Sequence, residues 1–421
     1  MPRRTVAAVI REQASGGAVV TQIDNYDQVD VFVGLDVGKG EHHAVALDRV
    51  GTKLYDRALP NDERRLRAVI ADLQIHGVVL LIVDQPATIG ALPIAVAQAA
   101  GALVGYLPGL AMRRIADLHP GEAKTDARDA AIIAETARTM PHTLRSIQAT
   151  DEQVAELTML CGFDDDLAAQ ITQVGNRVRG LLTQIHPALE RAMGPRLDHP
   201  AILDLLQRYP SLAAVRAAGE KRVATRMLKL APRKGRDWAH EIIAALGEQT
   251  VVVTGTNAAA LVLPRLAAQL ASLRKQRDEV AAEVEKMVDA HPLQPVLTSM
   301  PGVGVRTAAR LLTEVAGKHF PTAGHLAAYA GLAPVTRRSG SSIRGEYSSR
   351  RGNKILKNAM FLSAFAALRD PESRAYYDRK ISQGKRHNQA LLALARRRSD
   401  VLYAMLRDGS LYQPSPTRLV A

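Results

Sequence analysis

Cysteine is almost absent from this chain of 421 residues, which contains only Cys161. A single cysteine excludes an intramolecular disulfide and a cysteine-based zinc knuckle. Cys161 lies in an apolar run with helical spacing, so we expect it to be a core residue. The cysteine content therefore fits a reducing compartment without requiring one.

Aromatic residues are also scarce, at 4% of the chain with one tryptophan. A protein that binds single-stranded nucleic acid by stacking bases on aromatic rings usually has more of them. Long apolar runs are missing as well, and the basic start MPRRTVAAVIREQ is not followed by the apolar region of a signal peptide. We therefore expect no signal peptide and no membrane-spanning helix.

Positive charge, in contrast, is abundant. The 55 lysines and arginines outnumber 42 acidic residues, which gives a net charge of +13 and a pI of about 9.9. An excess this large usually indicates a polyanionic partner, which can be DNA, RNA or an anionic membrane. A soluble protein that merely happens to be basic is the alternative. Because aromatics are few, contacts to a phosphodiester backbone are favoured over an aromatic platform.

The first third of the chain has the pattern of an α/β domain, which we expect to span 30–146 after a flexible arm over 1–29. Three short runs with β-type composition and turn signals between them predict an antiparallel meander, at 31–37, 42–48 and 52–59. The all-apolar run VVLLIVD (78–84) predicts a buried central strand, and 102–107 predicts another. Helices are expected at 61–76, 91–101 and 124–140.

The rest of the chain is predicted to be mainly helical. Apolar positions at spacings of three and four residues predict two long amphipathic helices, over 151–190 and 257–290, that pack on each other or on a second subunit. We expect a helical, coiled-coil region over 150–292 with an insertion over 195–255, a mainly α C-terminal domain over 293–410 and a tail over 411–421. The insertion contains the basic segment PRKGRDW, for which a nucleic-acid contact is the one functional interpretation open.

Four aspartates stand where elements of the α/β domain end or begin. Asp36 and Asp84 each end a predicted strand, and Asp126 and Asp129 share one face near the start of a predicted helix. Because the carboxyl ends of adjacent strands open into one crevice, these acids could converge there. Unpaired acids at close range repel unless a cation is present, and Mg²⁺ prefers carboxylate and phosphate oxygens. The alternative is that they are turn residues and helix caps.

Three segments, GLDVGKGEHHAVALD, VDQPATIGALPIAVAQAAG and AKTDARDAAIIAETA, resemble the N-terminal RuvC-like, RNase H-type domain of the DEDD transposases, insertion-sequence recombinases associated with bridge RNAs. The resemblance implies a catalytic and metal-binding set for two Mg²⁺ ions, formed by Asp36, Asp84, Asp126 and Asp129. The family usually has glutamate where this chain has Asp84, and the shorter arm moves the carboxylate by roughly one bond length (~1.5 Å). Glu41 and Asp48 are less well placed substitutes.

The segment LTSMPGVGVRTAARLL resembles a helix-hairpin-helix element. Gly302 and Gly304 would let backbone N–H groups and a helix N-terminus approach a DNA phosphate closely. An ordinary glycine-containing turn between two helices is the alternative interpretation.

The segment that begins HLAAYAGLAPVTRRSGSSIRGEYSSRRGNKILK resembles the C-terminal transposase domain of the same family. The matching pattern runs through Tyr329 to Pro334, Ser339-Gly340 and Gly352-Asn353. The resemblance implies that Ser339 is the catalytic nucleophile, with Ser341 and Ser342 as the alternatives. Nearby cations could bind the scissile phosphate: Arg337, Arg338, Arg344, Arg350, Arg351 and Lys354. A simple phosphate clamp is the competing interpretation.

Together these resemblances imply a DNA transposase or recombinase. A covalent serine–DNA ester keeps the energy of the phosphodiester, whereas hydrolysis by water loses it. The expected partners are double-stranded DNA, a structured guide RNA and further copies of the chain, as a dimer or tetramer formed through the long helices. The expected location is the bacterial cytoplasm, in association with the nucleoid. The rival functions are a metal-only nuclease, such as a junction resolvase, and an inactive DNA-binding protein.

Overall fold

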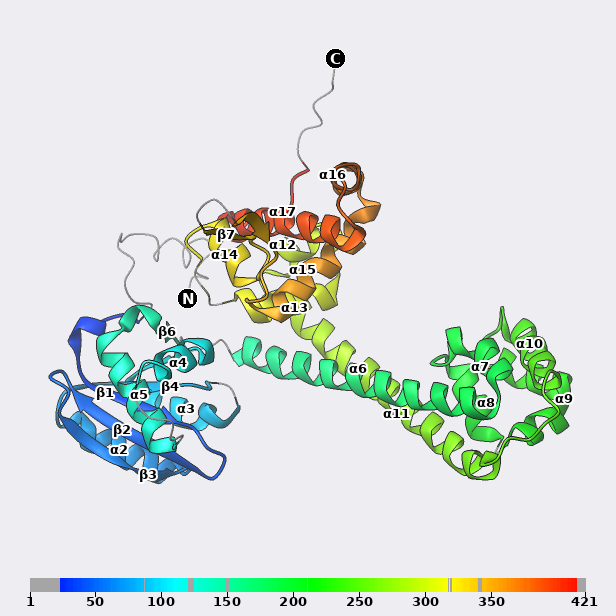
Figure 1. Ribbon diagram of the computed structural model, residues 1–421, viewed down its shortest axis with the longest axis horizontal. Helices are drawn as coiled ribbons and strands as arrows, with labels where there is room; N and C mark the ends of the chain where they lie inside the picture. Colours follow the sequence, from blue (N-terminus) through cyan, green and yellow to red (C-terminus); the bar gives the residue numbers. More distant parts are fainter. Residues whose placement is uncertain are drawn as a thin grey trace, which may run out of the picture. The chain divides into compact units, whose positions relative to one another are not determined.

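The computed structural model describes residues 23–86, 88–119, 125–147, 152–209, 211–316, 318, 320–339 and 343–414. For residues 146, 152, 337–339, 343 and 344 it describes the backbone only. The chain divides into two compact units, the first ending at residue 150 and the second comprising most of the chain beyond it (Figure 1). Each unit is described by itself below.

In the described residues, the first unit contains a six-stranded mixed sheet in the order β3-β2-β1-β4-β5-β6. The strands are β1 (Val29–Asp36), β2 (Glu41–Asp48), β3 (Lys53–Pro60), β4 (Val78–Val83), β5 (Leu103–Tyr106) and β6 (Arg145–Ser146). β1 to β3 form an antiparallel meander, β1, β4 and β5 are parallel, and β6 is antiparallel to β5. The predicted meander and central strand are confirmed. The sequence did not predict β6, whose two residues carry no period.

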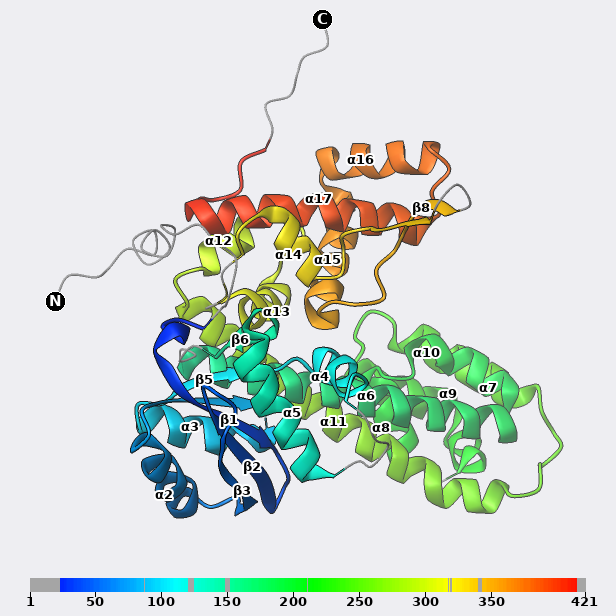
Figure 2. The same cartoon turned by 60° about the vertical axis from the view of Figure 1, so that its left-hand side comes forward.

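Helices cover both faces of this sheet (Figure 2). They are α2 (Glu63–Gln74), α3 (Ala91–Ala99), α4 (Gly109–Ala116) and α5 (Asp126–Thr139), with short 3₁₀ turns η1 (Tyr26–Gln28), η2 (Thr88–Gly90) and η3 (Pro141–Thr143). Odd-numbered residues of β1 such as Val33 pack with α2 and α3, while even-numbered ones such as Phe32 face α4 and α5. A Cβ at Gly34 would lie 2.2 Å from the Ala130 carbonyl oxygen, so the backbone of α5 rests directly on β1.

In its described residues, the second unit has one β-hairpin and is otherwise built from helices and their connections. Its long helices, α6 (Glu152–Ile185) and α11 (Thr256–Ala290), pack along each other, as the sequence predicts. Between them lie α7 (Pro187–Met193), η4 (Gly194–Arg196), α8 (Pro200–Arg208), α9 (Leu212–Leu228) and α10 (Gly235–Gly247). After them come α12 (Gln294–Ser299), α13 (Val305–Val315), α14 (Ala323–Tyr329), β7 (Val335–Ser339), β8 (Ile343–Tyr347), α15 (Lys354–Ala366), η5 (Ala367–Arg369), α16 (Pro371–Ser382) and α17 (His387–Asp408). No helix in the described part of the chain is long and apolar enough to cross a membrane.

Cys161 is buried on α6, in a core that α6 and α11 share with helices α12 to α17. Burial raises the pKa of its thiol to about 11, so the thiol stays protonated at neutral pH. The predicted core role of this cysteine is confirmed.

A buried ion network joins α6, α11 and α13. The Asp164 carboxylate of α6, 9% exposed, accepts hydrogen bonds from Arg277 at 2.8 Å and Arg310 at 2.9 Å. Burial alone would raise the pKa of Asp164, but the hydrogen bond and charge of Arg277 and the charge of Arg310 hold it below its ordinary value. The carboxylate therefore adds stability at neutral pH that is lost as the pH falls below about 4.

Replacing Asp164 by alanine leaves two guanidinium groups facing each other, so we expect a loss of about 3 kcal/mol in the free energy of unfolding. Asp165 is the matched control, because it pairs with the same Arg310 but its side chain is 57% exposed. Asp165→Ala should cost less than about 1 kcal/mol. Chemical denaturation at pH 7 measures both values, and equal losses would contradict this view of the network.

Candidate active site

Asp36 and Asp84 lie side by side at the carboxyl ends of neighbouring parallel strands. Asp36 is the last residue of β1, Asp84 follows β4 directly, and the preceding pair in the register is Leu35 with Val83. Adjacent strands are about 4.8 Å apart. Side chains alternate along a strand, so both aspartates share the sheet face that carries Gly34 and is covered by α5.

The start of α5 points to the same edge of the sheet. The Tyr26 hydroxyl, just before β1, donates to the carbonyls of Ala137 and Arg138 at 2.6 and 2.9 Å. The end of α5 therefore lies beside the start of β1, and the two elements run antiparallel. Asp126 and Asp129, in the first turn of α5, consequently lie toward the end of β1 that carries Asp36.

Asp126 and Asp129 occupy a well-formed helix start. The Thr125 hydroxyl accepts a hydrogen bond from the Arg128 N–H at 3.2 Å, which caps the helix. Asp126 is exposed and Asp129 is half-buried. The cap fixes the direction of the first turn, and the spacing of three residues places both carboxylates on one face.

Asp84 has the most unusual environment of the four acids. Its Oδ1 is buried and has no hydrogen-bond partner among the described residues, while its Oδ2 accepts from Gln85 Nε2 at 3.5 Å. Burial raises the pKa of Asp84, and the hydrogen bonds from Gln85 and from backbone amides, that of Val37 included, offset this only in part. A buried carboxylate oxygen without a donor fits a cation ligand.

The acids share an edge of the sheet without forming a closed cage. Within the described ranges, no group of three or more His, Cys, Asp or Glu side chains is placed to hold a metal ion. The two substitutes considered from sequence lie elsewhere on β2. Asp48 is at its far end, where its carboxylate accepts from the Val50 and Thr52 amides in the turn to β3. Glu41 is exposed at the start of the strand.

Sequence reasoning missed the two histidines beside Asp36. His43 lies directly opposite Asp36 in the antiparallel pairing, on the α5 face, and its Nε2 is 2.8 Å from Asp56 Oδ1. His42, on the other face, is 2% exposed and accepts the Gly38 N–H at 3.1 Å, which fixes the turn after Asp36. The alternation of β2 was the available signal, because His43 shares its face with Val45 and Leu47.

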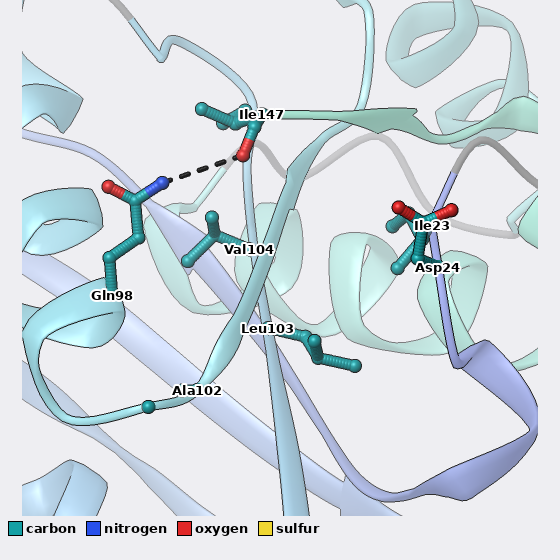
Figure 3. A pocket seen from close by; sticks show the side chains of 8 residues that line it. Ile23, Asp24, Gln98, Ala102, Leu103, Val104 and Ile147 are labelled. Carbon is teal, nitrogen blue, oxygen red and sulfur yellow. Dashed lines mark hydrogen bonds between the residues drawn. The ribbon is translucent and has the colours of Figure 1, made fainter. Parts of the chain in front are cut away.

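A shallow pocket of about 290 Å³ in the first unit lies away from the acids (Figure 3). The Gln98 amide spans it to the Ile147 carbonyl at 3.5 Å. It includes Leu103, the first residue of β5, and is therefore near the amino end of the parallel strands, opposite to the end that carries Asp84. Its lining is Ile23, Asp24, Gln98, Gly101, Ala102, Leu103, Val104 and Ile147. It provides no part of the acidic edge.

In the second unit, β7 and β8 form an antiparallel hairpin that carries the proposed nucleophile. Ser339 is the last residue of β7 and pairs with Ile343. The structure describes only the backbone of Arg337, Arg338, Ser339 and Arg344. Gly340, Ser341 and Ser342 lie outside the described residues.

The two ends of the hairpin are tied together by a buried polar network. The Asn353 N–H donates to the Tyr329 carbonyl at 2.7 Å, and the Asn353 amide group donates to the Tyr329 hydroxyl at 3.1 Å. Both the Asn353 amide and the Tyr329 hydroxyl donate to the carboxylate of Glu314, which is 8% exposed. Asn353 also caps α15 by accepting the Leu356 N–H at 2.8 Å.

Two glycines permit the chain to close at this point. Gly331 has φ of 65°, and a Cβ there would lie 2.1 Å from the Arg351 carbonyl oxygen. Gly352 has φ of 99°, and its Cβ would lie 2.4 Å from the nitrogen of Gly331. The sequence pattern that contains these glycines, Tyr329 and Asn353 therefore has a physical role, which is to form the base of the hairpin.

Three predicted phosphate contacts lie just beyond the hairpin. Arg350, Arg351 and Lys354 are exposed and form no ion pair with a described residue. Their side chains are available to an anion beside the hairpin base.

The predicted glycine-rich turn joins α12 to α13. Gly302 has φ of 78°, and its Cβ would lie 2.5 Å from the Ser363 carbonyl oxygen, so packing against α15 is sufficient reason for a glycine. Gly304, at the N-cap of α13, has open space around it. Under the turn, buried Arg398 donates to Ser363 Oγ and the Pro301 carbonyl, and burial lowers its pKa to about 10. Arg398 therefore keeps its charge at neutral pH.

Comparison with known proteins identifies the family. A family model described as a transposase matches residues 33–187, and a model of the IS116/IS110/IS902 family of transposases matches residues 294–378. The chain is 59% identical to the 43.6 kDa protein of insertion element IS110 from Streptomyces coelicolor, over 92% of this chain and 96% of the relative. It is 38% identical to the 42 kDa protein of insertion element IS900 from Mycobacterium paratuberculosis, over 93% and 99% of the two chains.

A partial match reaches proteins that invert DNA. The chain is 35% identical to the pilin gene-inverting protein of Moraxella bovis, over 27% of this chain and 36% of the relative. The two family matches fall on the unit that carries the acidic edge and on the helices that carry the serine hairpin. The protein therefore belongs to the IS116/IS110/IS902 family of transposases and is an enzyme that acts on DNA.

Proposed function

We propose that the protein cuts and rejoins the DNA of an insertion sequence by Mg²⁺-dependent transesterification, with Ser339 as the nucleophile. The observation that carries the proposal is the acidic edge. Asp36 and Asp84 end adjacent parallel strands, and α5 directs Asp126 and Asp129 to the same end of the sheet. The mixed sheet with acids at one edge supports the assignment of a RuvC-like, RNase H-type domain to residues 30–146.

The four aspartates fit divalent metal because they offer hard oxygen ligands, one of them buried without a donor. Two Mg²⁺ ions held there would neutralise charge on the phosphate and activate the attacking hydroxyl. Asp84 is the ligand whose shorter side chain departs from the glutamate usual in the family. Its neighbour on β1, Asp36, is the partner that the strand pairing places closest.

The serine chemistry balances as an exchange of one phosphodiester for another. A new bond forms between Ser339 Oγ and phosphorus, the bond from phosphorus to one deoxyribose oxygen breaks, and the released hydroxyl takes up a proton. Attack by a hydroxyl of a second DNA end reverses the exchange and frees the serine. Arginine and lysine beside the hairpin would hold the phosphate and stabilise its added charge, as proposed for Arg337, Arg338, Arg344, Arg350, Arg351 and Lys354. Gly304 at the open start of α13 is proposed to approach a second phosphate, with Gly302 shaping the turn.

The base of the hairpin is proposed to position Ser339. The Glu314–Tyr329–Asn353 network and the close approach of Gly331 to Gly352 fix where β7 begins and where the segment after β8 rejoins the helices. A nucleophile must be held within a fraction of an ångström of its target to react efficiently. The same network fixes the direction of α15, whose first residue is the proposed phosphate contact Lys354.

The proposed partners besides DNA are a structured RNA and further copies of the chain. Guidance by a structured RNA rests on the family resemblance, and the net charge of +13 suits RNA as well as DNA. Assembly into a dimer or tetramer through the long helices is supported by Met159 and Phe163, which lie one turn apart on α6 and are 78% and 45% exposed. The proposed location is with the DNA of a bacterial nucleoid.

Ser339→Ala is expected to abolish both cleavage and rejoining of element-end DNA in the presence of Mg²⁺, because the variant lacks the hydroxyl that forms the ester in the proposed mechanism. DNA binding should remain. Ser348→Ala is the matched control, since this exposed serine lies in the same segment beyond β8. Normal cleavage by Ser339→Ala would instead support a metal-only nuclease, in which the hairpin only clamps DNA.

Asp84→Asn is expected to raise the unfolding temperature at pH 7 without divalent metal. Because burial raises the pKa of Asp84, the folded state favours the protonated acid, and stability is lost as the pH rises through that pKa. The difference from the wild type should disappear below about pH 4. Mg²⁺ should stabilise the wild type more than the variant.

Asp72→Asn serves as the control for this measurement, because Asp72 is exposed on α2, which covers the other face of the sheet. It should leave the unfolding temperature and its response to Mg²⁺ unchanged. If the wild type were more stable than Asp84→Asn at pH 7 without metal, the charged Asp84 carboxylate would not destabilise the folded protein, and this prediction would be wrong.

Gly331→Ala is expected to reduce cleavage, because the added methyl group forces apart the two ends of the hairpin. DNA binding, which does not depend on Ser339, should be retained. Its free energy of unfolding should fall by about 2 kcal/mol or more. Gly384→Ala is matched to it, with φ of 82° but no atom within 4 Å of the added Cβ. The control should lose about 1 kcal/mol and keep full activity. Equal activity in the two variants would contradict the positioning role.

A further inference from the structure

The helical insertion carries a feature that the serine and metal chemistry does not use. The first family match ends at residue 187 and the second begins at residue 294. Neither covers α8, α9 or α10. In this insertion α9 and α10 pack against each other as a hairpin, joined by the turn 229–234 (Figure 1). The turn and the helix ends beside it contain a concentration of basic side chains.

The turn is a rigid platform. A Cβ at Gly235 would lie 2.7 Å from the backbone nitrogen of Leu228, so the end of α9 and the start of α10 touch through their backbones. The buried Ala231 donates its N–H to Met227 at 2.8 Å and accepts the N–H of Gly235 at 2.8 Å. Side chains on this turn are therefore presented from fixed backbone positions.

Four exposed cations have no partner, three of them at the turn or the start of α10 and one about two turns earlier on α9. They are Arg222, Lys229, Arg233 and Arg236, and none forms an ion pair or side-chain hydrogen bond with the residues that the structure describes. We call them the turn cations. A fifth cation, Lys234, reaches only Asp237, at 3.6 Å.

Two other arginines of the insertion are compensated by acids. Arg226, between Arg222 and Lys229 on the same face of α9, binds the Asp204 carboxylate through two nitrogens at 2.6 and 2.7 Å. Arg196 pairs with Glu241. Acidic partners are therefore present in the insertion, but the turn cations are not paired with them.

The placement of the turn cations opposes folding stability. Like charges on an ordered turn repel, and basic side chains at a helix N-terminus face the positive end of the helix dipole. Arg233 precedes α10 and Arg236 lies in its first turn. An anion bound at the turn would reverse both effects.

The available chemistry favours a phosphodiester backbone over stacked bases. Trp238, the one tryptophan of the chain, is engaged by the Arg196 guanidinium at 5.2 Å and by the His199 ring at 4.7 Å. The turn thus offers charge without an aromatic platform, which suits the regularly spaced phosphates of a duplex. Because the chain belongs to a transposase family, a nucleic acid is the polyanion that it meets in its reaction.

We propose that the turn cations of the α9–α10 hairpin form a second nucleic-acid interface, which binds the phosphate backbone of a duplex outside the catalytic site. We take the duplex to be DNA, because the chain is an enzyme that acts on DNA, and a duplex RNA is the alternative that the test examines. This interface increases the affinity of the protein for the duplex, which it contacts at phosphates other than the scissile one. It does not depend on which residue is the nucleophile.

The test is the salt dependence of binding by the full-length protein. Fluorescence anisotropy is measured on a duplex DNA and on a duplex RNA of the same sequence, at several salt concentrations. One variant combines Arg222→Gln, Lys229→Gln, Arg233→Gln and Arg236→Gln. The matched control removes the same charge from exposed positions on α2 and α11, by Arg64→Gln, Arg265→Gln, Lys275→Gln and Lys286→Gln.

Each phosphate contact contributes about 0.9 to the slope of log K against log salt concentration. Removing the turn cations should therefore reduce this slope by about 3 to 4, and the control by less than about 1. A reduction with duplex DNA supports the proposal, and a reduction with duplex RNA alone would overturn the choice of DNA as the ligand. Equal slopes for the two variants, or a slope unchanged from the wild type, would overturn the proposal.

Two further measurements keep these outcomes interpretable. The unfolding temperature of the turn variant should equal or exceed that of the control, because the variant lacks the repulsion between the turn cations. Cleavage at saturating protein should be retained, since no turn cation belongs to the proposed catalytic set. Failure of the interface and failure of the serine mechanism are thus distinguished, because the binding assay requires no cleavage.

Discussion

The parallel pairing of β1 with β4 is the constraint on which the proposed chemistry depends. It places Asp36 beside Asp84 at one sheet edge, and the contact of α5 with β1 at Gly34 directs two more aspartates to that edge. Bringing carboxylates together and burying an oxygen of Asp84 raises the free energy of the folded state. In the proposed mechanism a divalent cation would offset this penalty and would also supply the catalytic charge. Without such a cation, the acids proposed for catalysis lower the stability of this edge.

The position of the hairpin in the second unit also depends on contacts with neighbouring elements. A strand pair of five residues each has little stability alone, so its ends must be fixed by the helices around it. Glu314, Tyr329 and Asn353 do this with partly buried hydrogen bonds, and Gly331 allows the backbones to touch. The glycine at 302 is likewise explained by contact with α15. These residues of the family pattern are therefore explained by packing and hydrogen bonding. The proposed chemical role falls to the side chains of the hairpin that they position.

Much of this arrangement was predictable from sequence, because it follows from the spacing of apolar residues and from the residues at the ends of the predicted strands. Alternating apolar residues indicated the meander, the unbroken apolar run at 78–84 indicated the central strand, and the acids at strand ends followed from both. The two-residue β6 has no such pattern. The pairing of His43 with Asp36 and the network around Glu314 depend on contacts between residues distant in sequence, 39 positions apart for Glu314 and Asn353. The unpaired state of the turn cations required knowing where the acids lie.

The most direct test of the account is to identify the residue that carries DNA. The protein is incubated with Mg²⁺ and element-end DNA, denatured and digested with protease and nuclease, and the peptide bearing a nucleotide is sequenced by mass spectrometry. The account predicts a nucleotide on Ser339 in a peptide from the β7–β8 hairpin, and none when Asp126 is replaced by alanine. A nucleotide on another residue, or efficient cleavage without any modified peptide, would contradict it.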